Sequence, residues 1–283
     1  MWPVYRSMLF VSGETPERFP KALAAGADLV CIDLEDAVAG DRKQQARQDA
    51  LAFASVRRAE PLALRINGLR TREGLADVLA LIESQVCLDA VILPKVESVD
   101  EVALFQAWAT GRFKQIVALI ESPLGLERAA QIARAALHEA PGLGALMLGG
   151  ADLSAELQAS FDWDGLRHAR GCLVTAARAS GLQAWDVPYI DLADPEALAD
   201  ESRRVLRLGF DCKTAIHPSQ IPVIHRAFAP SDAETRWANA LLAQVEQRGQ
   251  SAGAFLFEGR MVDPPVLAKA RQIAKRASFN PVN

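Results

Sequence analysis

Eight short apolar runs, each followed by a longer amphipathic stretch, recur along the first 228 residues. The runs are too brief for helices, and most are bounded by Gly, Pro, Asp or Asn, which is typical of strands. The expected strands are 6–11, 28–34, 61–66, 89–93, 114–120, 144–148, 183–187 and 211–216. The expected helices are 16–26, 42–58, 72–85, 98–110, 125–139, 164–180, 195–208 and 219–228. This alternation predicts an α/β protein with a parallel sheet.

Eight β-then-α units are the number that closes a (β/α)8 TIM barrel, and a doubly wound open sheet is the alternative. No Pro- or Gly-rich linker interrupts 1–228, so we expect one catalytic barrel domain there. The remaining segment, 229–283, is expected to hold two helices, 232–248 and 264–278, with a turn at 251–253 between them. We interpret it as a C-terminal helical extension of the same structural unit, acting as a lid or an oligomerisation arm.

Charge and composition exclude several classes of protein. Lys plus Arg number 31 and Asp plus Glu 35, a net charge of −4 that gives no electrostatic footprint for nucleic acid. The longest stretches without charge, 140–151 and 214–225, are too short for a membrane span, which needs roughly 20 apolar residues. No basic leader precedes an apolar stretch at the N-terminus. The four cysteines are widely spaced and read as reduced thiols, so we expect a cytoplasmic protein.

Histidine and cysteine patterns make three enzyme classes poor candidates. The four histidines form no i,i+4 metal pair, and neither a G-x-S-x-G nor a G-x-x-x-x-G-K motif is present. We therefore do not expect a zinc hydrolase, a serine hydrolase or a P-loop NTPase.

Polar side chains instead gather where the expected strands end. The strand-end residues are Asp33, Glu35, Asp36, Arg65, Asn67, Lys95, Glu97, Glu121, Asp152 and His217. The carboxyl ends of barrel strands meet at one mouth, so we expect these groups to converge. Carboxylates without clustered His or Cys favour Mg²⁺, with Mn²⁺ possible. Glu121 and Asp152 suit that duty, although a salt bridge or a helix cap would explain each equally well.

Two further features have both a chemical and a structural interpretation. The backbone at Gly149–Gly150 can approach a ligand and cradle a carboxylate, or can be an ordinary strand-to-helix turn. Arg65 can pair with a substrate oxyanion, or can be the structural partner of the acids Asp33, Glu35 and Asp36. Both roles of Arg65 are compatible with each other.

Taken together, seven segments resemble the citrate lyase β-subunit-like branch of the HpcH/HpaI aldolase family. They are RSMLFVSGETPERFPKALAAGADLVCIDLEDAV, LRING, VILPKVES, ALIESPLGL, LMLGGADLSAEL, GFDCKTAIHPSQIPVIHRAF and FEGRMVDPPVLAKARQI. The resemblance implies a (β/α)8 barrel that assembles as a homotrimer or hexamer. It also implies a Mg²⁺-dependent lyase that cleaves a citramalyl-, malyl- or citryl-CoA-type thioester into an α-keto acid and acetyl-CoA.

The same resemblance implies roles for individual residues. Glu121 and Asp152 would hold Mg²⁺, and Arg65 would bind an oxygen of the scissile unit and stabilise the thioester enolate. The backbone of Gly149, Gly150, Ala151 and Asp152 would hold the keto-acid carboxylate. Asp263 would reach into a neighbouring subunit as general acid/base, and Glu35 and Asp36 would orient metal-bound water and Arg65. Arg18 and Lys21 would meet the CoA phosphates, unless they are plain surface cations.

The chain departs from the family pattern in the first loop, in the seventh strand and in its tail, which is shorter than in the longer malyl-CoA lyases but keeps the Asp263 motif. FVSG replaces the usual FVPG, which puts Ser12 in the first loop, and Trp185 stands where smaller residues are common, either narrowing the acyl pocket or simply packing. A malyl-CoA-type thioesterase and a citrate lyase β subunit acting on a carrier-bound thioester are alternatives on the same scaffold. A non-enzymatic keto-acid-binding barrel is the alternative from a different class.

Overall fold

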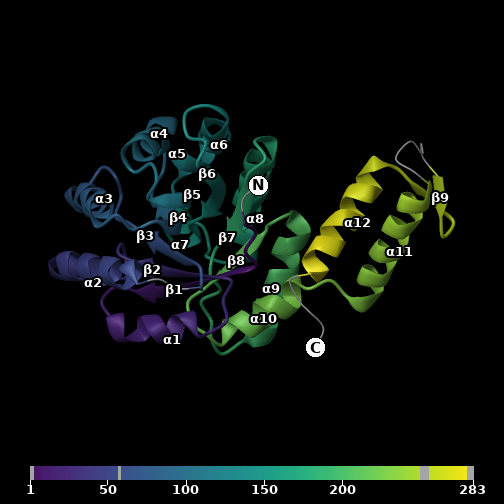
Figure 1. The fold of residues 1–283 in the computed structure, drawn as a ribbon, viewed down its shortest axis with the longest axis horizontal. Helices are drawn as coiled ribbons and strands as arrows, with labels where there is room; N and C mark the ends of the chain where they lie inside the picture. Colours follow the sequence, from purple (N-terminus) through teal and green to yellow (C-terminus); the bar gives the residue numbers. More distant parts are fainter. Residues whose placement is uncertain (1–2, 57–58, 249–254, 279–283) are drawn as a thin grey trace. The chain divides into compact units, whose positions relative to one another are not determined.

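The computed structural model describes residues 3–56, 59–248 and 255–278. By its contacts the chain divides into two compact units, 1–224 and 225–283, called here the barrel unit and the C-terminal unit. In the barrel unit eight parallel strands close in the order β1 to β8, with helices around them (Figure 1). The strands are β1 Ser7–Ser12, β2 Leu29–Asp33, β3 Leu62–Arg65, β4 Leu88–Leu93, β5 Phe113–Ile120, β6 Leu143–Leu148, β7 Gln183–Asp186 and β8 Cys212–Ala215.

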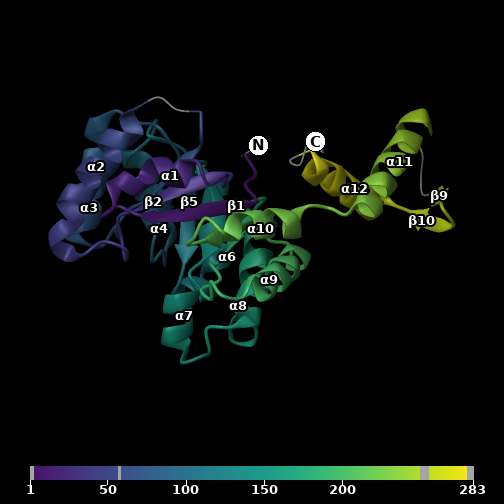
Figure 2. The same ribbon diagram turned by 90° about the horizontal axis from the view of Figure 1, so that it is seen from below.

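Closure is visible in the register of β1, where Met8 pairs with Leu29 of β2 on one side and with Thr214 of β8 on the other. All eight expected strands are present, and the predicted TIM barrel is confirmed in place of the doubly wound sheet. Helices α2 and α3, for example, lie outside the strands in both views (Figures 1 and 2). The helices that follow the strands are α1 Phe19–Leu23, α2 Lys43–Ser55, α3 Arg72–Ser84, α4 Val99–Trp108, α5 Pro123–Glu127, α6 Ala129–Arg134, α7 Gly150–Leu157, α8 Trp163–Ala179, α9 Pro195–Leu208 and α10 Gln220–Phe228.

Three helical segments differ from the expectation. The helix expected over 16–26 is a 3-10 turn, Pro16–Arg18, followed by the short α1. The single helix expected over 125–139 is divided into α5, α6 and a 3-10 turn, Ala135–Leu137. Helix α7 was not expected at all, because it begins at the second glycine of a Gly-Gly pair and its eight residues are too few to show a helical period. This helix matters for function, since its first turn carries Asp152.

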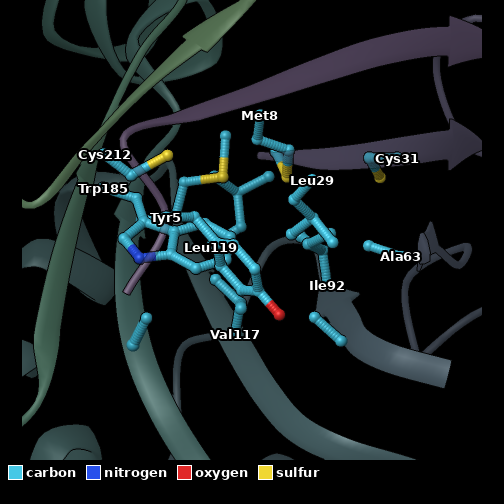
Figure 3. Packing of buried hydrophobic residues seen from close by; sticks show 13 residues of the cluster. Tyr5, Met8, Leu29, Cys31, Ala63, Ile92, Val117, Leu119, Trp185 and Cys212 are labelled. Carbon is cyan, nitrogen blue, oxygen red and sulfur yellow. The ribbon is translucent and has the colours of Figure 1, made fainter. Parts of the chain in front are cut away.

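Side chains from the strands fill the interior of the barrel (Figure 3). Tyr5 and Trp185 meet edge to face with ring centroids 6.0 Å apart, and Cys212 lies beside Trp185. The indole Nε1 of Trp185 donates a hydrogen bond to Oε1 of Gln183 at 3.0 Å, and the side chain is fully buried. The structure therefore supports packing as the role of Trp185.

A buried ionic network fastens α8 and α9 to the barrel wall. Asp186 accepts hydrogen bonds from Arg170 Nε at 2.8 Å and Lys213 Nζ at 2.7 Å, and Lys213 also contacts Glu201 at 2.5 Å. Burial alone would raise the pKa of Asp186, but the charges of Lys213 and Arg170 outweigh it and hold that pKa below its usual range. The network links two strands to their flanking helices.

The C-terminal unit contains α11 Asp232–Arg248, the antiparallel pair β9 Phe255–Phe257 and β10 Arg260–Val262, and α12 Pro264–Ala277. Its small core comprises Ala238, Leu241, Val262, Ala270 and Ile273. The two helices were expected; the hairpin was not, since three-residue strands show no usable alternation. The turn expected at 251–253 lies outside the described residues. No helix in the described part of the chain has the length and apolarity to cross a membrane.

Candidate active site

Arg65 and Asp33 form the first part of the site at the carboxyl ends of β2 and β3. They are register partners on neighbouring strands. The guanidinium donates two hydrogen bonds to the carboxylate, from Nε to Oδ1 at 2.7 Å and from Nη2 to Oδ2 at 2.5 Å. Nη1 lies 2.9 Å from Oε2 of Glu35. A guanidinium has five N–H donors, so this pairing leaves donors available for a ligand. Both interpretations of Arg65 remain compatible: it has a structural partner, and it lies at the mouth.

Lys95 connects acids from different strands. Its Nζ donates to Oε1 of Glu35 at 2.6 Å and lies 3.3 Å from Oδ2 of Asp152 and 3.7 Å from Oδ1 of Asp36. Burial would lower the pKa of Lys95, but its hydrogen bond to Glu35 and the surrounding negative charges raise it above the ordinary value. Lys95 is therefore an ammonium at the centre of this group.

Glu121 follows β5 and is almost completely buried, with 4% of its surface exposed. Its Oε1 accepts a hydrogen bond from the backbone N–H of Lys95 at 2.8 Å. Burial, and next the negative charge of Glu35, raise the pKa of Glu121 to about 8, against the opposing effects of Arg65 and Lys95. Gly149 makes room for this side chain: a Cβ there would lie 2.3 Å from Glu121 Cβ and 2.5 Å from Oε2.

Donors for an anionic ligand come from the first turn of α7. The leading N–H groups of a helix have no partner within it, and Gly150, Ala151 and Asp152 occupy these positions. Gly149 does not add a donor, because its N–H is bonded to the carbonyl of Ile120 at 2.9 Å. Gly149 contributes instead by having no side chain, which leaves space for Glu121. The backbone donors expected over 149–152 are therefore limited to Gly150, Ala151 and Asp152.

The carboxylates fit a divalent cation by their chemistry. Glu121, Asp152 and Lys95 line one pocket with a volume of about 240 Å³. Glu35 Oε2 is buried and has no aligned hydrogen bond despite its ion-pair distance to Arg65, so an acceptor is left over. Among the described residues no three His, Cys, Asp or Glu side chains form a metal-binding cluster. A Mg²⁺ site needs only one or two protein carboxylates, with water and substrate oxygens completing it.

The remaining predicted residues, Arg18, Lys21 and Asp263, belong to other elements of the chain. Arg18 and Lys21 are exposed at the first crossover, in the 3-10 turn Pro16–Arg18 and in α1. Asp263 belongs to the C-terminal unit, where it caps α12 by accepting a hydrogen bond from Val266 N–H at 3.1 Å. The structure thus brings Arg65, Glu35, Asp36, Glu121 and Asp152 together and describes Asp263 within its own unit.

Sequence reasoning missed one contribution to the site. Lys95 was noticed only as a charge at a strand end, and its contact with three acids carries no local sequence signal. Ser12, where the family pattern has Pro, donates from Oγ to the carbonyl of Ala37 at 2.6 Å and accepts from Glu14 N–H. The departure from the pattern therefore joins the first loop to the second.

Known proteins resemble the chain over nearly its whole length. A family model described as HpcH/HpaI aldolase/citrate lyase matches residues 6–218. The citrate lyase subunit beta-like protein of Mycobacterium tuberculosis is 38% identical over 276 residues, covering 95% of this chain and 94% of that protein. The mitochondrial citramalyl-CoA lyase of Rattus norvegicus is 31% identical over 293 residues, covering 96% and 86%.

A solved structure is also similar to this chain over nearly its whole length. The protein CitE from Mycobacterium tuberculosis, crystallised with magnesium, acetoacetate and coenzyme A, superposes with a TM-score of 0.79 at 37% identity. The alignment covers 97% of this chain and 98% of that one. The chain therefore belongs to the HpcH/HpaI aldolase/citrate lyase family and is a carbon–carbon lyase related to the citrate lyase β subunit.

Proposed function

We propose that the chain cleaves a 3-hydroxy-3-carboxyacyl-CoA of the citramalyl-, malyl- or citryl-CoA type into an α-keto acid and acetyl-CoA, with Mg²⁺ as its cofactor. The observation that carries this proposal is a set of contacts at the barrel mouth. Lys95 contacts Glu121, Asp152 in the first turn of α7, and Glu35. Glu35 in turn contacts Arg65. This set combines acids for a hard cation with donors for anionic oxygens. The magnesium and coenzyme A in the related CitE structure support the same assignment.

Each group has a defined task in this reaction. Free N–H groups of Gly150, Ala151 and Asp152 bind the carboxylate that leaves with the keto acid. Arg65, held against Asp33, offers its remaining N–H donors to the thioester oxygen, where negative charge develops as the carbon–carbon bond breaks. Glu121 and Asp152 would hold Mg²⁺, which lowers the pKa of the substrate hydroxyl and polarises the nascent carbonyl when bound.

The acids around Arg65 hold the cationic side chains of the site in place. Glu35 contacts both Arg65 and Lys95, so it fixes these two cations relative to each other. Its unaligned Oε2 and the half-exposed carboxylate of Asp36 are suited to orient water at the mouth. Exposed Arg18 and Lys21 are suited to meet CoA phosphates.

Asp263 is the proposed general acid/base that protonates the enolate carbon. We propose that it acts in the site of a neighbouring copy, so that the active form is a homotrimer or hexamer. The segment 229–283 would then be both lid and assembly arm. A cytoplasmic location is proposed with it, consistent with four free cysteines.

The experiment is keto-acid release from malyl-, citramalyl- and citryl-CoA, measured with Mg²⁺, with EDTA, and with Mg²⁺ restored after EDTA. We expect release from at least one thioester, its loss with EDTA and its recovery with Mg²⁺. Glu121→Gln and Asp152→Asn should lower turnover by about 10³-fold or more, since each removes a carboxylate that positions the cofactor. Turnover that survives EDTA and both substitutions contradicts the proposal.

A further inference from the structure

Lys95 has an unusual backbone for its place in the fold. Its φ of 54° lies in the left-handed region, which non-glycine residues rarely adopt. The other described non-glycine residues with positive φ end helices or turn a hairpin: Gln85 follows α3, Gln158 follows α7, and Glu258 lies between β9 and β10. Lys95 instead lies just beyond the end of a barrel strand, β4. Such conformations persist where the surroundings enforce them, and they cluster at functional sites.

The two ends of Lys95 contact different acids of the site. The backbone N–H donates to Glu121, whereas the ammonium at the far end of the side chain reaches Glu35 at 2.6 Å and Asp152 at 3.3 Å. Glu121 lies just after β5, Glu35 lies in the segment after β2, and Asp152 lies in α7. One residue therefore joins three crossovers of the barrel. The side chain is half-exposed, so packing alone does not hold it there.

We propose that Lys95 is a positioning residue that sets the Mg²⁺ affinity of this site. Its N–H fixes Glu121, and its ammonium gathers Glu35 and Asp152 while competing with the cation for Asp152. The inference rests on the proposed function for the identity of the cation and the two ligands.

The physical reason is local charge. Glu35, Asp36 and Asp152 all lie within 4 Å of the Lys95 ammonium, and without it their negative charges would repel one another more strongly. The same positive charge would repel a divalent cation held by Asp152, because the ammonium of Lys95 lies 3.3 Å from Oδ2 of that residue. Lys95 thus gives order to the acids and weakens their hold on Mg²⁺. When only the charge is removed, the loss of order among the acids would weaken Mg²⁺ binding, whereas the loss of repulsion would strengthen it.

The test is Lys95→Met, which keeps the backbone N–H and an unbranched side chain only one atom shorter but removes the charge. Mg²⁺ binding to the purified full-length protein is measured by isothermal titration calorimetry. We expect the dissociation constant to fall by about tenfold, while Lys95→Arg, which keeps the charge, stays near wild type. Lys114→Met is the matched control. Lys114 pairs with Asp89, and this substitution removes the same charge from another part of the barrel. It should leave Mg²⁺ affinity unchanged.

The sign of the change decides the outcome. A purely structural Lys95 predicts weaker Mg²⁺ binding in Lys95→Met, because the acids would lose their order. Unchanged or weaker binding in that variant, with circular dichroism and melting showing a folded protein, overturns the inference. Thioester cleavage by the wild type is assayed in parallel. If the wild type cleaves no thioester but Lys95→Met still binds Mg²⁺ more tightly, the proposed function fails and the role of Lys95 stands.

Discussion

Replacing Gly149 by Ala tests whether the site depends on the close approach of Glu121. The added Cβ would lie 2.3 Å from Glu121 Cβ and 2.5 Å from Oε2, whereas ordinary contact begins near 3.4 Å. The two groups must therefore separate by about 1 Å more. Backbone strain is not the issue, since Gly149 has φ −99° and ψ 79°, a conformation open to alanine. The clash itself must move Glu121 or the start of α7.

The expected cost follows from that displacement. Overpacking of this kind costs about 1–3 kcal/mol of stability. Glu121 also loses its aligned hydrogen bond from Lys95 N–H, now 2.8 Å long. A 1 Å misplacement of a group in the site can cost about 10²-fold in rate. We therefore expect Gly149→Ala to lower both Mg²⁺ affinity and turnover by about that factor.

The assays are urea denaturation, Mg²⁺ calorimetry and thioester cleavage, with Gly171→Ala as the matched control. Gly171 lies inside α8, and a Cβ there meets nothing within 4 Å. The control should gain about 0.5–1 kcal/mol, because alanine is the better helix former, and should cleave substrate as the wild type does. Wild-type Mg²⁺ affinity and turnover in Gly149→Ala would refute the role given to the Gly149–Glu121 contact.

Three further outcomes are expected. Asp186→Asn should lower the unfolding free energy in urea by about 3–5 kcal/mol, because Arg170 and Lys213 would stay buried without their carboxylate; a loss below 1 kcal/mol would contradict this. Folding lowers the pKa of Asp186, so the stabilisation by its carboxylate is complete above the unfolded pKa of about 3.9 and is lost as pH falls through the folded pKa. The difference in unfolding free energy between wild type and Asp186→Asn should therefore shrink only below about pH 4. Asp263→Asn should reduce turnover by about 10²- to 10⁴-fold with unchanged Mg²⁺ affinity. Mixed oligomers formed by subunit exchange between the Asp263→Asn and Glu121→Gln variants should recover activity. No recovery would mean that Asp263 does not act in a neighbour's site.

Most of the fold was predictable because it depends on patterns that repeat along the chain. Each strand is a short apolar run whose carboxyl end carries polar residues, and eight such units leave few alternatives to a closed barrel. The elements that were missed are too short to show a period: α7 has eight residues, and β9 and β10 have three each.

The candidate site was predictable only in part, for a related reason. Strand ends show which residues reach the mouth, so Arg65, Glu121 and Asp152 were found from their positions. How these residues contact one another depends on backbone details that leave no local trace. The left-handed φ of Lys95 is an example, since nothing in the letters PKV requires it. Gly149 is another example: the sequence allowed a close approach to a ligand or an ordinary turn, whereas the structure shows Glu121 in the space a side chain would take.

The most direct test of the central claim is the product balance from a single thioester such as citramalyl-CoA. Mass spectrometry of the quenched reaction should find acetyl-CoA and pyruvate in equal amounts, both absent with EDTA and both restored by Mg²⁺. Free CoA accumulating beside the intact hydroxy acid would contradict carbon–carbon cleavage, because it would mean that the barrel hydrolyses the thioester instead.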